Sequence, residues 1–168
     1  MALSIRYATE EDAQAVLAIT IEAFTIYAHE LGKPELVYAL NETTYDIALD
    51  MERKHVLLAL LDDKPAGSIR FEVIGEVAYL SRFGVFRDFQ KFGVGRALLA
   101  QVHVLCENLG VKAAALHTSS RMFSLMRFYY GNQYFVHSTS DERGYVRALL
   151  IHEFEENADY SLDAIMGK

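Results

Sequence analysis

At residues 90–95 the chain reads Gln-Lys-Phe-Gly-Val-Gly, and this short stretch decides how the sequence around it folds. The apolar run at 77–85 that precedes it predicts a strand. After it, apolar residues recur at helical spacing and predict a helix that ends at a glycine cap, Gly110; they are Val94, Leu98, Val102, Leu105 and Leu109. The stretch therefore joins the end of a strand to the start of a helix.

The start of that helix is a favourable place for an anion. The first amides of a helix have no partner within the helix and carry the positive end of its dipole, so backbone donors alone can bind a pyrophosphate there. Gly93 and Gly95 allow positive φ and a close approach of the ligand, while Lys91 and Arg96 add charge. A plain glycine turn is the alternative interpretation of the same residues.

Two other nucleotide-binding motifs do not fit this stretch. A Rossmann fingerprint requires a third glycine and an acidic residue about 20 positions later. Here the third glycine position is Leu98, and residues 113–116 read Ala-Ala-Ala-Leu without an acid. A Walker A loop is excluded because the chain contains no G-x-x-x-x-G-K-[ST] string.

The rest of the sequence predicts one α/β domain over residues 1–168, with a mixed, mostly antiparallel sheet and helices on both faces. The expected order is β-α-α-β-β-β-α-β-α-β-β. Strands are expected at 3–7, 56–61, 67–73, 77–85, 113–118, 134–138 and 145–153. Helices are expected from about residue 10 to the loop at Gly32, after Asn41, from residue 94, and at 122–130.

The buried faces of two elements can also be predicted. We expect Leu3, Ile5 and Tyr7 on the buried face of the first strand, because they alternate with polar residues. In the second helix the expected apolar side carries Tyr45, Ala48 and Met51. The last segment, residues 155–168, is rich in acidic side chains and is expected to form a tail or a docking segment.

Composition limits the classes of function. With 16 basic and 23 acidic residues the net charge is −7, which disfavours a nucleic-acid partner. The single cysteine, Cys106, excludes an internal disulfide and is expected to be a buried packing residue. No apolar run approaches the roughly 18 residues of a membrane helix, and no signal-peptide core is present, so we expect a cytoplasmic protein without a membrane partner. No metal site is expected, because five histidines lack ligand spacing and are assigned to the surface or to packing: His29, His55, His103, His137 and His152.

The segment 85–99 resembles the acetyl-CoA signature of the GCN5-related N-acetyltransferase (GNAT) family, V-x-P-x-x-[RQ]-x-x-G-x-[GA] followed by a helix. Residues 5–12 are similar to the opening strand and first helix of that family, and Phe128-Tyr129 followed by Tyr134-Phe135 resembles its FYxxxGF block. The resemblance covers about residues 3–153. Three positions depart from the residues usual in these motifs, which are proline, asparagine and glycine: Arg87, Met122 and Gln133.

This resemblance implies acetyl-CoA as the acetyl donor. The pyrophosphate would bind the amides from Lys91 to Arg96, and pantetheine would pair with backbone groups near Phe83 and Val85, where a β-bulge splays the strand. The Val85 amide would then stabilise the oxyanion. The implied cofactor-binding residues are Phe83, Val85, Gln90, Lys91, Phe92, Gly93, Val94, Gly95, Arg96 and Tyr129.

The resemblance also implies catalytic residues. Tyr129 matches the family tyrosine that protonates the departing sulfur, with Tyr130 as the alternative if the register differs. Tyr79 falls where several family members carry a glutamate base, so water or another residue would take the proton of the amine. His117 is a candidate base because imidazole titrates near neutral pH, and two carboxylates are weaker candidates, Glu72 and Glu76. Packing or surface roles are the alternative for all of them.

Together these features predict an acetyl-CoA-dependent N-acetyltransferase in which a primary amine attacks the donor directly. The expected acceptor is a small amine, an amino acid, an aminoglycoside-like compound or a peptide N-terminus. A homodimer is expected only because members of the family commonly dimerise. The alternative function is a CoA-binding regulatory or interaction domain of the same fold that has lost turnover.

Overall fold

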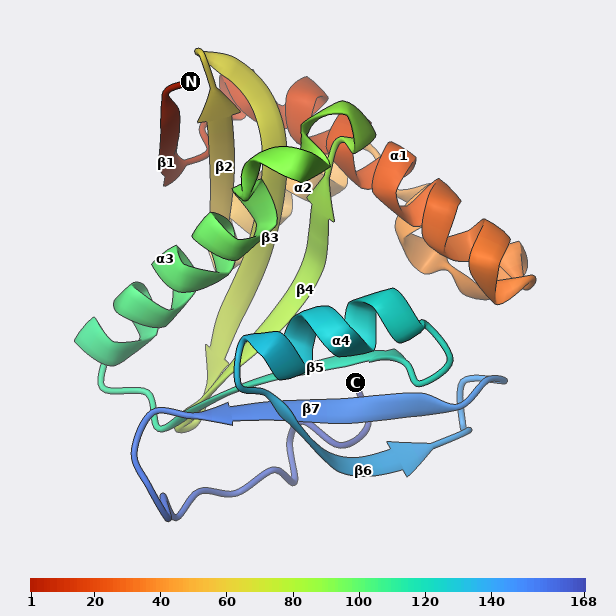
Figure 1. Ribbon diagram of the computed structural model, residues 1–168, viewed down its shortest axis with the longest axis vertical. Coiled ribbons are helices and arrows are strands. Elements are labelled where there is room, and N and C mark those ends of the chain that lie inside the picture. Colours follow the sequence, from red (N-terminus) through yellow and green to blue (C-terminus); the bar gives the residue numbers. More distant parts are fainter. The chain divides into compact units, whose positions relative to one another are not determined.

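The computed structural model describes all residues of the chain, 1–168, and contains the predicted order of strands and helices (Figure 1). Hydrogen-bonded neighbours give the strand order β1-β2-β3-β4-β5-β7-β6. The pair β4–β5 is parallel, and the pairs β1–β2, β2–β3, β5–β7 and β6–β7 are antiparallel, which confirms the predicted mixed, mostly antiparallel sheet. The chain packs as two compact units, residues 1–72 with 82–102 and residues 73–81 with 103–168.

The first unit contains the N-terminal helices and strands. They are β1 (Leu3–Tyr7), α1 (Ala13–Leu31), α2 (Thr44–Arg53), β2 (His55–Leu61), most of β3 (Lys64–Ile74), the second half of β4 (Val77–Val85) and the start of α3 (Val94–Asn108). Four short 3-10 turns connect them: η1 (Glu10–Asp12), η2 (Pro34–Leu36), η3 (Tyr38–Asn41) and η4 (Arg87–Phe92). No helix of the structure combines the length and apolar character needed to cross a membrane.

The ends of α1 follow from local sequence. The predicted start at residue 10 is the turn η1, where Thr9 and Asp12 form a capping box just before α1. Arg6 contacts the Asp12 carboxylate at 2.7 Å, and this hydrogen bond is the main reason why the pKa of Asp12 falls to about 2. Gly32 ends α1 with φ +73°, a backbone angle that glycine adopts without strain.

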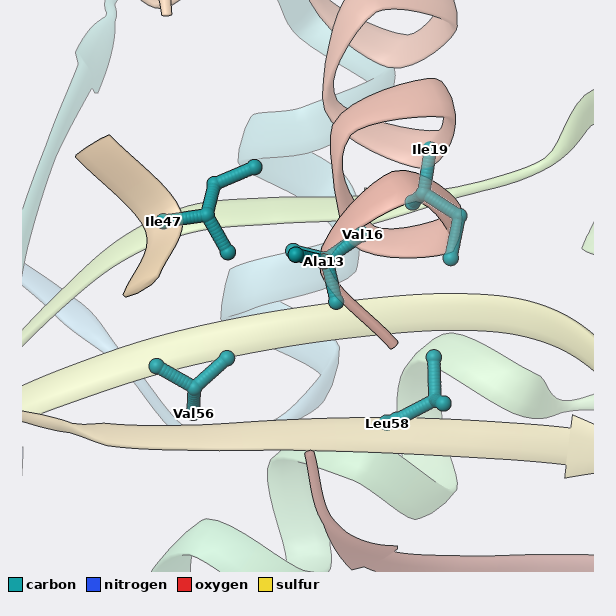
Figure 2. Close-up of a cluster of buried hydrophobic side chains, with 6 residues drawn as sticks. All are labelled: Ala13, Val16, Ile19, Ile47, Val56 and Leu58. Atoms are coloured by element: carbon teal, nitrogen blue, oxygen red, sulfur yellow. The ribbon is translucent and has the colours of Figure 1, made fainter. Parts of the chain in front are cut away.

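The core of the first unit lies between α1, α2 and β2. Figure 2 shows side chains of the two helices pointing toward those of the strand; they are Ala13, Val16 and Ile19 of α1, Ile47 of α2, and Val56 and Leu58 of β2. Full burial of a valine, leucine or isoleucine stabilises the fold by about 1.5–3 kcal/mol. Figure 1 shows α3 in front of β2 and β3 and α2 behind them, so helices cover both faces of these strands.

Two of the predicted buried faces need correction. In α2 the buried residue is Ile47, with Met51 packed beside it, whereas Tyr45 is exposed. Ile47 and Met51 stand four residues apart and share one side of the helix, so the stripe is shifted from the predicted one. In β1, Tyr7 is exposed and its hydroxyl lies 2.8 Å from Nδ1 of His55.

The second unit contains the rest of the sheet. It comprises the first half of β4, the end of α3, β5 (Ala113–Ser119), α4 (Phe123–Gly131), β6 (Phe135–Ser140) and β7 (Arg147–Glu153). β5 pairs with β7 along its whole length, and α4 lies above β7 and over β5 in the view of Figure 1. The cap at Gly110 is confirmed by its φ of +73°. The predicted place of Leu109 on the buried face was wrong, because Leu109 follows the end of α3 and is exposed.

The segment 155–168 docks on the second unit. Ile165 is buried in a cluster with residues of β4, β5 and β7, and Tyr160 and Leu162 pack against the same cluster. The predicted alternatives were a tail or a docking segment, and three apolar residues of the segment pack on the second unit. This segment brings Lys168 next to β4, where Nζ lies 5.5 Å from the ring centroid of Tyr79.

Candidate functional site

In the first unit, the turn at residues 90–95 has the geometry expected of an anion-binding helix start. Residues up to Phe92 form η4, Gly93 turns the chain with φ +73°, and α3 begins at Val94. The Ala97 amide donates to the Gly93 carbonyl at 3.0 Å. The three amides before Ala97 therefore precede the hydrogen-bond ladder of the helix and point out of its positive end.

The surroundings of this turn have room and charge for a phosphate-bearing group. A Cβ built on Gly93 would meet no atom within 4 Å, so the space beside this residue is open. Lys91 and Arg96 are exposed, and neither takes part in an ion pair with a carboxylate. Val94 is buried against β3, where it faces Gly67. The side chain of Val94 thus anchors the turn against β3.

Just before this turn, β4 has an irregular backbone. Arg82 has φ +51° in the middle of the strand, which for a non-glycine residue costs about 1–3 kcal/mol. Farther along β4, the Val85 carbonyl accepts from Nε2 of Gln90 at 3.4 Å, and the Phe86 amide donates to Ala66 at 2.8 Å. The structure therefore brings the predicted residues Val85 and Gln90 together.

A buried ionic cluster holds this part of β4, and sequence analysis missed it. Arg70 of β3 is 0% exposed and donates to both carboxylate oxygens of Glu42, at 2.8 and 2.9 Å. The same guanidinium contacts Asp50 at 2.8 Å and Thr20 at 3.2 Å. Glu42 lies 3.2 Å from Nε of Arg82, so one carboxylate joins both arginines. An arginine within an apolar strand was the signal available in the sequence.

In the second unit, the structure pairs two of the predicted catalytic residues. Tyr79 lies on β4 and His117 on β5, and the hydroxyl of Tyr79 is 2.7 Å from Nδ1 of His117. The two strands run parallel, with Tyr79 opposite Ala115. His117 is two residues further along β5 and therefore lies on the same face of the sheet as Ala115, within reach of the tyrosine. The predicted base and the tyrosine predicted in place of a glutamate therefore form one hydrogen-bonded pair.

Charge and burial determine the protonation of this pair. The pKa of His117 is lowered to about 4, mainly by burial and in the same direction by the positive charges of Arg147 and Arg143. His117 is therefore neutral at pH 7 and able to accept a proton. Sequence analysis missed the two arginines, which lie at the end of the predicted turn 140–144 and at the start of β7.

Tyr129 is placed differently from its neighbour Tyr130. Tyr129 on α4 is 6% exposed, and its ring makes edge contacts with Phe128 at 5.3 Å and with Tyr134 at 5.6 Å between centroids. Tyr130 is 53% exposed. Of the two, Tyr129 is the one that the fold holds in a fixed position.

Two histidines of the second unit, His103 and His152, pack together with Tyr134. His103 Nε2 lies 2.8 Å from the hydroxyl of Tyr134, and its ring stacks on His152 at 4.4 Å. Burial, together with His152, lowers the pKa of His103 to about 4. Cys106 is fully buried and its pKa is raised to about 12, mainly by burial, which confirms its packing role.

The two weaker carboxylate candidates lie in ion pairs. Glu72 of β3 is 3.8 Å from Nζ of Lys54 in the first unit. Glu76, in the turn after β3, is 3.1 Å from Nζ of Lys112 in the second unit. Neither is part of the Tyr79–His117 pair.

Comparison with known sequences finds a family match. The sequence model of the acetyltransferase (GNAT) family matches residues 17–132. A curated protein of Bacillus subtilis that is provisionally named an acetyltransferase is 26% identical over 61 residues, which are 36% of this chain. The match spans 42% of the length of that curated relative.

Comparison with solved structures finds the same fold. The PaiA N-acetyltransferase of Thermoplasma acidophilum, solved with coenzyme A, has a TM-score of 0.81 at 18% identity and covers 92% of this chain and 100% of its own. The ribosomal-protein-S18-alanine N-acetyltransferase of Escherichia coli has a TM-score of 0.73 at 18% identity, covering 95% and 100%. The YncA protein of Salmonella typhimurium, solved with acetyl-CoA, has a TM-score of 0.73 at 15% identity, covering 96% and 99%.

Proposed function

Because the chain belongs to the acetyltransferase (GNAT) family, we propose that it is an N-acetyltransferase that moves the acetyl group of acetyl-CoA to a primary amine. The observation that carries this proposal is the open helix start at Gly93, with three amides ahead of the α3 ladder and two exposed basic side chains beside it. Family relatives solved with coenzyme A or acetyl-CoA support the same donor.

The residues of the turn fit the charged part of this donor. The amides of Val94, Gly95 and Arg96 would hold the pyrophosphate, and the side chains of Lys91 and Arg96 would balance its charge. Bound acetyl-CoA supplies an activated thioester for acyl transfer. Binding through the backbone explains why Arg87, in place of the usual proline, does not remove a contact from the site.

Three groups are assigned roles in the transfer itself. The Val85 amide would donate to the developing oxyanion, and Tyr129 would donate a proton to the departing sulfur. The pair Tyr79–His117 would accept the proton of the amine nitrogen once its bond to the acetyl carbon has formed and made that nitrogen acidic, because His117 is neutral at pH 7 and its Nδ1 is in hydrogen-bond contact with Tyr79. A tyrosine in the place of a glutamate is thereby compatible with turnover.

Binding and turnover are tested separately. Isothermal titration with acetyl-CoA should give a Kd that Lys91→Glu weakens by about fivefold, equivalent to about 1 kcal/mol of exposed charge interaction. Lys64→Glu, an exposed change in the β2–β3 hairpin, is the matched control and should leave the Kd unchanged.

Turnover is then followed as release of free thiol from acetyl-CoA in the presence of single amines: a polyamine, amino acids, an aminoglycoside and a peptide N-terminus. Release that depends on one of these amines supports the proposal. Tight binding of acetyl-CoA without acceptor-dependent release across the panel would favour the CoA-binding domain without turnover. No binding of acetyl-CoA would overturn both.

A further inference from the structure

Lys168 occupies a polar position on the second unit that a ligand could also fill. Its main-chain oxygen accepts from Nη2 of Arg143 and, at 3.3 Å, from Nη1 of Arg147. Its side-chain nitrogen lies 5.5 Å from the ring centroid of Tyr79. A single residue thus places one oxygen on two guanidinium groups and one amine on an aromatic face.

The two guanidinium groups favour a carboxylate at this position. Arg147 is 8% exposed, its Nε is buried without a hydrogen-bond partner, and no Asp or Glu side chain pairs with it. A buried guanidinium is costly unless an anion compensates its charge. Arginine is also the side chain that binds carboxylates in a planar, bidentate manner. The position therefore has the chemistry of a carboxylate subsite.

The other end of the same position suits an amine. The face of an aromatic ring attracts an ammonium group within about 6 Å. The ring at this end is that of Tyr79, whose hydroxyl contacts His117 at 2.7 Å. An amine bound there is beside the pair that the proposed function assigns to proton removal.

We propose that Arg143, Arg147 and Tyr79 form the acceptor subsite and that the acceptor is an ω-amino acid, an amine joined to a carboxylate by a flexible chain about as long as a lysine side chain. Lys168 occupies this subsite when no acceptor is bound. The inference rests on the proposed acetyl transfer and specifies its substrate class. The arginines bind the carboxylate, and the amine lies at Tyr79.

The kinetic test compares two acceptors that differ only in charge, 6-aminohexanoate and 6-aminohexanamide, with thiol release as the signal. The expected kcat/KM for the acid is higher than that for the amide by about tenfold or more, mainly through KM. Arg143→Gln should reduce this preference to within about twofold, and Arg143→Lys should restore part of it. Arg127→Gln, an exposed change on α4, is the matched control and should keep the preference.

A binding test needs neither acetyl-CoA nor turnover. The expected product, 6-acetamidohexanoate, should raise the melting temperature of the full chain in a concentration-dependent manner, and 6-acetamidohexanamide should not. Arg143→Gln should abolish the rise while Arg127→Gln keeps it. This readout also covers the case in which a variant loses activity for structural reasons.

The outcomes separate this inference from the proposed function. Equal use of the acid and the amide, or a preference that survives Arg143→Gln, overturns the subsite. Thiol release with a polyamine or a peptide but with neither hexanoate compound overturns the subsite and leaves the proposed function in place. If no amine supports thiol release, the proposed function is overturned. The assignment of Arg143, Arg147 and Tyr79 as an acceptor subsite is then overturned as well, even if the melting test shows that a carboxylate binds.

Discussion

The hydroxyl of Tyr79 on β4 lies 2.7 Å from Nδ1 of His117 on β5. The hydrogen bond joins the tyrosine predicted to stand where several family members carry a glutamate to the imidazole predicted as a base. It holds the imidazole of His117 in a fixed orientation beside the Tyr79 ring.

The pH dependence of turnover should reflect the lowered pKa of His117. Its pKa of about 4 lies below the ordinary 6.5, so the imidazole stays in its neutral, proton-accepting form down to that pH. We expect kcat/KM to show no acid limb from this group between pH 7 and pH 5.5. A profile measured by thiol release would contradict the assignment if it showed an acid limb near pH 6.5 that His117→Gln removes.

Tyr129→Phe should lower kcat by about tenfold or more while leaving the Kd of acetyl-CoA nearly unchanged, because only the phenolic proton is removed. Tyr130→Phe is the matched control, since Tyr130 is the exposed neighbour on the same helix. Single-turnover kinetics and titration calorimetry measure the two quantities. An unchanged rate for Tyr129→Phe, with normal melting of both variants, would remove Tyr129 from the mechanism.

Gly84→Ala should destabilise the protein by about 1–3 kcal/mol, because the added Cβ would lie 2.6 Å from the Cβ of Ala23 on α1. Ala23→Gly alone costs about 1 kcal/mol of helix propensity. In the Ala23→Gly background, however, the Gly84→Ala change should cost less than in the wild type. Urea unfolding of the wild type, the two single variants and the double variant gives a double-mutant cycle. If the free-energy costs of the two changes simply add, the contact between residues 23 and 84 does not limit packing.

Arg70→Met should lower the free energy of unfolding by about 3–5 kcal/mol, because it leaves Glu42 and Asp50 without their buried partner. The control is Lys112→Met, which removes an exposed pair with Glu76 and should cost no more than about 1 kcal/mol. Chemical unfolding of both variants measures the difference. Similar costs for the two changes would mean that the Arg70 cluster adds little to stability.

Much of the fold could be predicted because local residues such as glycines indicate where helices and strands begin and end. The bounds of β4 match the predicted 77–85, and the glycines Gly32 and Gly110 end their helices with positive φ as expected. The buried side of α2 was predicted wrongly, because its short apolar pattern fits two adjacent stripes and only the packing of Ile47 against β2 distinguishes them. The single-domain organisation stays a prediction.

The candidate site was predicted less completely, and for a physical reason. The turn at 90–95 is a local motif whose conformation depends on nearby glycines, so the sequence indicates it directly. The contacts Tyr79–His117 and Arg70–Glu42 join residues 38 and 28 positions apart, and only the sheet brings them together. The positive φ of Arg82 has no sequence signal either, because it is imposed on a residue that does not favour it.

The burial of Cys106 determines how much background the protein itself adds to a thiol-release assay. The only thiol of the chain has no exposed surface, and its pKa of about 12 keeps it protonated in neutral buffer. Disulfide reagents attack thiolates, so the folded protein contributes almost no colour of its own when such a reagent titrates released coenzyme A. The same reagent should titrate one thiol per chain after denaturation in guanidinium, which makes the background of the assay a measure of how much protein is folded.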